Sequence, residues 1–346
     1  MSTKDLPTRF ENLLDLARLP YFEARAGRLV LADRSLGPAI DMHTHLALSY
    51  GPVRRTDLGR ATDEALLYLP KQRAIDLDLY MNKNLSRRDL RDLKVDLALY
   101  AFTARGMRAT HTVPNLAREM EELGVTRSVL LAIDFPFWSS NTRDWIAATR
   151  GRRDFVTFGS VHPLDPDPAR ALDEQVRLGA RGIKFHPQVQ QVPPDHPRAI
   201  ALFRMCGERG LPMLHHCGPV GIEPESGRLR TQVYRYEKGI AECPGTQFAL
   251  GHSGALQLGR AIDLARRYPN VWLELASQSL PGVRRILAEA PNDRVVYGSD
   301  WPFYHQAIGL AKVFLATDGN DALRRAVLHA NAARLLGSLS ESGPGE

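Results

Sequence analysis

Cysteine is scarce in this chain of 346 residues, which contains Cys206, Cys217 and Cys243 and no others. An odd number of cysteines with no Cys-x-x-Cys pair argues against a disulfide framework and against a structural zinc module. No stretch approaches the roughly 20 apolar residues that a membrane-spanning helix needs, and residues 1–11 lack the apolar segment of a secretory signal. We therefore expect a soluble cytoplasmic protein that does not enter a membrane.

Dense positive charge is also lacking, although the formal net charge is +6. Basic and acidic residues are interleaved, as at residues 87–92, and no run of Lys and Arg is interspersed with aromatic residues. This pattern argues against nucleic-acid binding. The basic balance fits a small-molecule substrate, and an anionic one would suit it.

Apolar runs alternate with helical patterns from residue 114 onward. Seven helical segments each lead into a short apolar run, such as residues 128–133 and 271–275, and the run at residues 39–45 makes eight. Because parallel strands must be joined by crossover segments, eight such units predict a (β/α)8 barrel, also called a TIM barrel. No glycine-rich phosphate loop follows the first strand, which argues against a doubly wound nucleotide-binding sheet.

Three segments fall outside this alternation. Residues 1–37, with a helical pattern at 10–19 and a hairpin near 28–31, are expected to form an N-terminal cap on the barrel of residues 38–337. The tail, residues 338–346, is expected to be disordered.

A long insertion follows the first strand, at residues 46–112, with helical patterns at 62–69 and 86–102. Connections of this length in a compact domain are usually functional. We expect it to act as a lid and to determine specificity.

The first strand carries two histidines that can act together. Period-two alternation in an extended chain sends Asp41, His43 and His45 to one face. Imidazole is the commonest side-chain metal ligand. The pair therefore predicts a metal site, provided that other strands supply further ligands.

Polar residues also follow the later strands, at the ends that form the active face of such a barrel. Seven of the eleven histidines occupy these ends, which satisfied core histidines would not be expected to do. Alternation allows only one of His215 and His216 to point inward. The strand-end residues are His43, His45, His162, Lys184, His186, His215, His216, His252 and Asp300.

Five motifs resemble, in order and spacing, those of the amidohydrolase superfamily. They are DMHTH at 41–45, GIKFHP at 182–187, LHHCG at 214–218, LGHSG at 250–254 and YGSDWP at 297–302. The likeness covers about residues 39–337. It is greatest to the amidohydrolase-related branch, which includes metal-dependent hydrolases of lactones and related bonds and non-oxidative decarboxylases.

The resemblance implies that His43, His45, His216 and Asp300 bind a metal ion. It also implies that His252 is a ligand or a proton-transfer group, and that Asp300 handles protons as well. Three histidines, one carboxylate and an open position suit a single catalytic zinc ion, although manganese or iron(II) would accept the same set.

Other residues are assigned less specific roles. Asp41 is expected to orient a ligand histidine without binding the ion. A lysine at the position of Lys184 bridges two metals in some branches of the superfamily, but the related branch mostly has single-metal sites. The candidates for substrate contact are His162, Lys184, His186, Arg235 and Trp301.

These expectations favour a metal-dependent hydrolase, in which activated water attacks the carbonyl of a lactone, ester or amide and Asp300 and His252 move protons. The alternative is a non-oxidative decarboxylase of an unsaturated or aromatic carboxylic acid, and the sequence does not separate the two. An arginine at the substrate carboxylate would favour decarboxylation. The candidates are Arg54, Arg55, Arg73 and Arg235.

A third hypothesis is a non-catalytic barrel that serves as a binding module. Such a protein would be expected to have lost ligands, whereas the ligand set is complete here. The resemblance is compatible with a homodimer, but no segment of the sequence indicates its interface.

Overall fold

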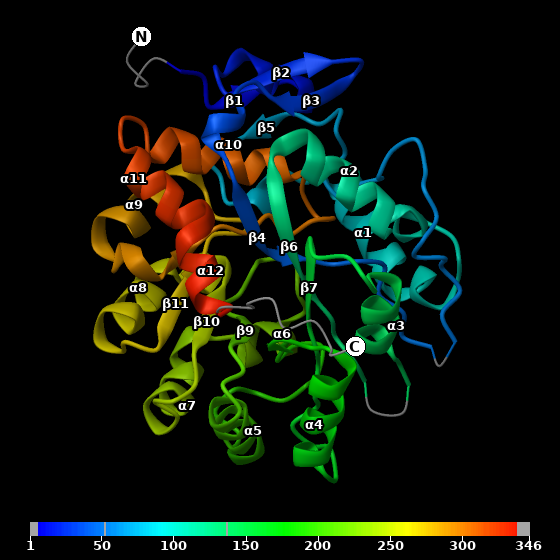
Figure 1. Ribbon diagram of the computed structural model, residues 1–346, viewed down its shortest axis with the longest axis vertical. Helices are drawn as coiled ribbons and strands as arrows, with labels where there is room; N and C mark the ends of the chain where they lie inside the picture. The colour runs from blue at the N-terminus through cyan, green and yellow to red at the C-terminus, as the bar shows by residue number, and fades with distance from the viewer. Residues whose placement is uncertain (1–5, 52, 136–137, 338–346) are drawn as a thin grey trace.

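Eight parallel strands form the centre of the molecule in the computed structural model, which describes residues 6–51, 53–135 and 138–337 (Figure 1). They belong to two sheets, of three and five strands. The strands of the first are β4 (Ala39–Thr44), β6 (Val125–Leu131) and β7 (Phe155–Phe158), and those of the second are β8 (Ile183–Phe185), β9 (Met213–His216), β10 (Phe248–Gly251), β11 (Val271–Glu274) and β12 (Val295–Val296).

Parallel bridges join the two sheets at both seams. Gly159 pairs with Ile183 between β7 and β8, and Thr44 pairs with Trp301 between β4 and the segment after β12. The amide of Met42 also donates to the carbonyl oxygen of Tyr297, at 3.0 Å. The strands therefore close into a ring, and the predicted TIM barrel is confirmed.

Helices cover the outside of the ring (Figure 1). Their boundaries follow local chemistry, as α4 shows: the Asp167 side chain accepts from the amide of Arg170, Pro168 occupies the first turn, and Gly179 ends the helix with a φ of 115°. The helices are α2 (Val113–Leu123), α3 (Asn141–Ala148), α4 (Pro168–Leu178), α5 (Pro197–Glu208), α6 (Glu225–Arg230), α7 (Tyr236–Glu242), α8 (Leu258–Arg267), α9 (Leu280–Glu289), α10 (Gln306–Ala316), α11 (Asp321–Arg325) and α12 (Asn331–Leu335).

The barrel interior is filled by a cluster of apolar side chains that includes Ile40, Met42 and Phe158. Ala332 and Leu335 of α12 belong to the same cluster, so this helix packs against the interior. A packed interior directs ligands to the end of the barrel, where polar residues replace the apolar ones.

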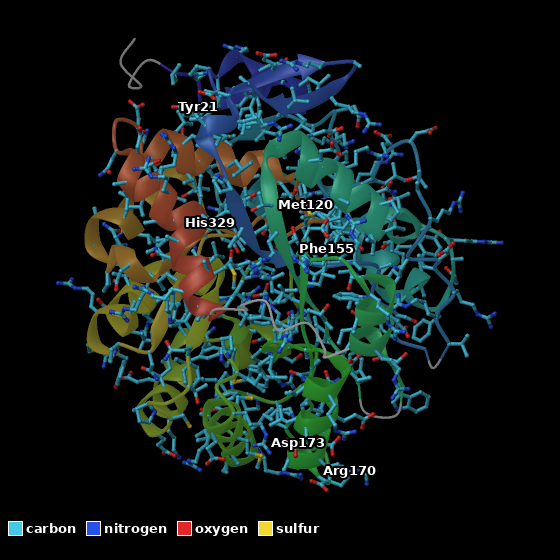
Figure 2. All side chains as sticks on the ribbon, in the orientation of Figure 1. Tyr21, Met120, Phe155, Arg170, Asp173 and His329 are labelled. Carbon is cyan, nitrogen blue, oxygen red and sulfur yellow. The ribbon has the colours of Figure 1, made fainter. Side chains whose placement is uncertain are left out.

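The N-terminal segment packs on the barrel beside α10 (Figure 1). Strands β2 (Phe22–Arg25) and β3 (Arg28–Leu31) form the predicted hairpin, and the two turn residues between them have positive φ, as a two-residue hairpin requires. Tyr21, labelled in Figure 2, contacts Phe314 of α10 with ring centroids 5.0 Å apart.

The helix predicted at residues 10–19 is wrong in part. Strand β1 (Arg9–Phe10) pairs with β5 (Ile75–Asp76) of the insertion, and a 3-10 helix occupies Leu13–Arg18. The Asn12 side chain accepts from the amides of Leu14 and Asp15, which starts the helix there.

In the described part of the insertion, residues 46–51 and 53–112, there is one α-helix, α1 (Arg87–Ala98), which begins with a capping box between Ser86 and Asp89. The helix predicted at residues 62–69 does not form, because Tyr68 and Leu69 instead donate backbone hydrogen bonds to the segment after β12. Within the described ranges, no helix is both long and apolar enough to cross a membrane. The predicted disordered tail, residues 338–346, lies outside them.

Candidate metal centre

A cavity of about 580 Å³ lies where the carboxyl ends of most of the strands meet. Residues at or just after the ends of seven strands line it, together with side chains of the insertion. The polar residues around its floor are His43, His45, Lys184, His186, His216, His252 and Asp300. Seven of the nine strand-end residues singled out in the sequence therefore reach one space.

The first strand does not alternate as predicted. Its register against β6 shifts between Asp41 and Thr44, which marks a bulge. Asp41 accepts from Gln306 of α10 at 2.7 Å and from the amides of His43 (3.0 Å) and Ser299 (2.9 Å). The prediction that Asp41 shares a face with His43 is therefore wrong: Asp41 contacts backbone and α10, and no imidazole.

Hydrogen bonds determine the protonation of the two β4 histidines. The Nδ1 atom of His43 lies 2.7 Å from the Glu274 carboxylate, and that of His45 lies 2.9 Å from the Leu131 carbonyl oxygen. Because both partners are acceptors, each Nδ1 carries the proton and each Nε2 keeps its lone pair, that of His43 lying 3.5 Å from the Lys184 Nζ atom. These Nε2 atoms lie 3.6 and 3.7 Å from the same oxygen, Oδ1 of Asp300.

His216 and His252 form a second histidine pair. The Nε2 atom of His252 lies 3.2 Å from Nδ1 of His216. The ring of His216 stacks on that of His186, with centroids 4.1 Å apart, while its buried Nε2 atom has no partner among the described residues. His216 thus has an unused lone pair at the cavity.

The neighbouring His215 faces the opposite way. Its ring stacks on Phe248, with centroids 5.0 Å apart, and meets Phe203 edge to face. The structure therefore resolves the alternative that alternation left open, since His216 and not His215 lines the cavity.

Asp300 follows β12 in a conformation that is uncommon for a residue other than glycine, with a φ of 65°. Its amide donates to the carbonyl oxygen of His43 at 2.8 Å, and Ser277 donates to its Oδ2 atom at 3.3 Å. Burial, together with the nearby Glu274 carboxylate, holds the pKa of Asp300 well above its usual range. Such strain concentrates at functional sites.

Glu274, at the end of β11, was missed by the sequence reasoning. It is fully buried and accepts from the His43 ring, from the amide of His252 at 3.0 Å and from the amide of Ala276. Burial raises its pKa to about 7. The one available signal was an isolated acidic residue within the apolar run at 271–275.

This donor set fits a divalent cation. Burial and the nearby Lys184 ammonium lower the pKa of His43 well below its usual range and that of His45 to about 3, so both rings are neutral, as metal ligands must be. The ligand atoms of His43, His45 and Asp300 lie within 4.8 Å of one another, as do those of His43, His252 and Glu274. His216 belongs to neither group, and its link to them is its contact with the His252 ring.

Three predicted substrate contacts lie away from this cavity. His162 donates to the Gln190 carbonyl oxygen at 2.9 Å and lines a separate cavity. Arg235 pairs with Asp195 at 2.7 Å on the surface. Trp301 is fully buried, with its Nε1 atom 3.2 Å from Glu119. Each side chain is held by a partner elsewhere, and none of the three lines this cavity.

The fold and the polar cavity define a TIM-barrel enzyme with a candidate metal site. The sequence profile of the amidohydrolase family matches residues 40–338. The chain therefore belongs to the amidohydrolase family, as its motifs predicted. No curated protein sequence matches the chain.

Solved structures share the fold at low sequence identity. An uncharacterised TIM-barrel protein from Bordetella bronchiseptica is 20% identical, with a TM-score of 0.60, over 86% of this chain and 98% of that one. The 5-carboxyvanillate decarboxylase from Novosphingobium aromaticivorans, in complex with manganese, is 18% identical (TM-score 0.54; 86% and 96% covered). A probable 2-pyrone-4,6-dicarboxylic acid hydrolase from Acinetobacter baumannii is 13% identical (TM-score 0.55; 87% and 100%). Both reaction types thus occur on this fold.

Proposed function

We propose that this protein is a metal-dependent hydrolase that cleaves a lactone, ester or amide bond of a small, largely apolar substrate. The ligands in this proposal are His43, His45, His216 and Asp300. Zinc is the first choice of metal, since three imidazoles and one carboxylate suit it, with manganese or iron(II) as alternatives.

The lining of the cavity supports hydrolysis more than decarboxylation. Apolar side chains such as Leu93, Leu97 and Ile133 make up much of the wall, and no arginine of the described chain lines it. Two of the proposed carboxylate-binding arginines, Arg54 and Arg73, are paired with carboxylates of the protein itself. A neutral acyl substrate therefore fits the wall better than a charged acid does, and the anionic substrate suggested by the overall charge is not what we propose.

The site residues suit the proton transfers of hydrolysis. A bound divalent cation would supply Lewis acidity and would lower the pKa of water from about 15.7 toward about 7. Asp300, whose Oδ1 faces both β4 imidazoles, is placed to accept the proton of the attacking water. Asp300 can then pass this proton to the leaving group, which balances the transfers, while His252 stays neutral with its Nε2 atom 3.2 Å from Nδ1 of His216.

Decarboxylation is the second candidate, and Lys184 is the observation that favours it. Its Nζ atom is buried and lies 3.5 Å from Nε2 of His43. Burial lowers its pKa to about 8, so the group is largely cationic at neutral pH. An ammonium ion at this position could neutralise a substrate carboxylate.

Two substrate panels distinguish the candidates. Protein loaded with zinc, manganese or iron(II) would be incubated with neutral lactones and phenyl esters, with acid release measured, and with hydroxybenzoates, with carbon dioxide release measured. We expect acid release that a chelator abolishes and that added metal restores. Carbon dioxide release without hydrolysis would reverse the order of the candidates, and full turnover in chelator by metal-free protein would refute both.

A further inference from the structure

Glu223 is a buried carboxylate in the cavity wall that lacks a counter-charge. It lies in the loop between β9 and α6, lines the cavity and is 8% exposed. Its Oε2 atom accepts from the amide of Ile222 at 2.9 Å, whereas its Oε1 atom has no partner in the described chain. A buried carboxylate with an unused oxygen is costly unless another group completes its hydrogen bonds.

The surroundings of Glu223 offer no such group. Val220 and Ile222 line the cavity beside it in the same loop. The two cations of the lining are elsewhere engaged or exposed: Lys184 lies against His43, and Lys94 projects from α1 into solvent. Glu223 forms no ion pair with another described residue, in contrast to Asp195, which pairs with Arg235 at 2.7 Å.

A second polar atom without a partner lies nearby. Tyr80, from the insertion, packs against Val220 and Ala255 and is 7% exposed, and its hydroxyl group has no hydrogen-bond partner among the described residues. Its pKa is held well above the usual range by burial, with the Asp300 and Glu223 carboxylates adding to the effect.

Asn82 holds this wall in place. Its side-chain amide donates to the Val220 carbonyl oxygen at 3.0 Å, and its Oδ1 atom accepts from the hydroxyl group of Tyr304. The insertion and the loop of Glu223 are thus tied together, which gives the carboxylate a constrained position in the cavity. A constrained polar group in a mostly apolar cavity is the usual means of orienting a ligand.

We propose that Glu223 determines specificity by accepting a hydrogen bond from a hydroxyl or amine group of the substrate. The proposal deepens the proposed function, because it places this donor on the substrate whose acyl bond would be cleaved at the metal site. A wholly apolar substrate would leave the Glu223 carboxylate buried and unpaired. A substrate with a hydrogen-bond donor would supply the partner that the Glu223 Oε1 atom lacks in the described chain. Hydrogen bonds to charged groups are worth about tenfold or more in affinity.

Binding of non-hydrolysable probes tests this proposal directly. Dissociation constants of 3-phenylpropanol, 3-phenylpropylamine and propylbenzene would be measured by NMR titration of the metal-loaded full-length protein and of its Glu223→Leu and Glu223→Gln variants. We expect Glu223→Leu to weaken the alcohol and the amine by about tenfold or more and to leave propylbenzene unchanged or tighter. In Glu223→Gln the alcohol should keep most of its affinity, because the amide oxygen still accepts, while the amine should lose most of its affinity.

A matched control is Glu225→Leu, which removes an exposed carboxylate that lies two residues away and does not line the cavity, and which should leave the affinities for all three probes unaltered. If Glu223→Leu does not fold, the divergence of alcohol and amine in Glu223→Gln still decides the matter, since this variant preserves an acceptor for the Ile222 amide. The proposal is overturned if Glu223→Leu weakens all three probes equally, or if neither variant changes the affinity of the alcohol or the amine.

The probes also separate this proposal from the proposed function, because they need no turnover. Loss of donor binding in Glu223→Leu together with an absence of ester or lactone hydrolysis by the wild-type protein would refute the hydrolase and retain the role of Glu223. Hydrolysis by the wild-type protein, together with unchanged binding of the alcohol and the amine in Glu223→Leu, would support the hydrolase and refute the role of Glu223.

Discussion

The floor and the wall of the cavity are built in different ways. The floor consists of strand-end residues whose imidazoles are oriented by buried acceptors, as Glu274 and the Leu131 carbonyl group orient His43 and His45. The wall comes from α1 and from the loop after β9, and it is mainly apolar with one unpaired carboxylate. This difference suggests that the barrel supplies the reaction and that the insertion and loop select the substrate.

The strongest test of this division is the pair of adjacent histidines on β9. We expect His216→Ala to lower kcat/KM by about a thousandfold and to reduce bound metal, because losing a ligand removes several kcal/mol of transition-state stabilisation. His215→Phe should keep full metal content and nearly full activity, since that ring packs only among aromatic residues. Metal analysis and steady-state kinetics would check both, and equal losses in the two variants would contradict the assignment.

The next test concerns the carboxylate behind the ligands. Glu274→Gln should weaken metal affinity by about 10- to 100-fold, because the amide orients the His43 ring less firmly and loses the negative charge. Competition with a chromogenic chelator would measure this affinity. Glu119→Gln is the control: this carboxylate is also buried, with its pKa raised to about 7, but its partners are Trp301 and Gln306. A similar loss of affinity in the control would show that the effect is not specific to the His43 contact.

Substitution of Asp41 tests whether the cavity floor is held in place by hydrogen bonds to the backbone as well as by the ligand side chains. Asp41→Asn should destabilise the fold by about 1–3 kcal/mol, since an amide cannot accept from all of the donors that now meet the carboxylate. Urea unfolding followed by circular dichroism would measure the change. Because Asp41 touches no imidazole, metal affinity should fall less than in Glu274→Gln, and the opposite order would restore Asp41 as the residue that orients a ligand.

The smallest effect is expected on the wall. Leu97→Ala should raise KM about threefold to tenfold with little change in kcat, because it removes apolar contact without altering the floor. Leu99→Ala, at the exposed end of the same helix, does not alter the lining and should behave like the wild-type protein. A large fall in kcat for Leu97→Ala would mean that the wall takes part in the reaction.

The sequence predicted the barrel and the residues of its floor because both are local signals. Alternation of helical and apolar segments specifies parallel strands, and the carboxyl ends of parallel strands meet at one end of a barrel. The sequence therefore sufficed to predict that five residues lie together at this end: His43, His45, His216, His252 and Asp300. Their roles as ligands and proton carriers stay predictions until metal binding and activity are measured.

What the tertiary structure alone decided was the direction of individual side chains. A one-residue bulge turned Asp41 toward α10, and long-range partners placed Trp301 against Glu119 and Arg235 against Asp195. Glu274 and Glu223 gained their importance from burial, which no local pattern records. Periodicity depends on residues that are close together in the sequence. Burial and hydrogen-bond partners depend on residues that are far apart in the sequence, so only the folded molecule shows them.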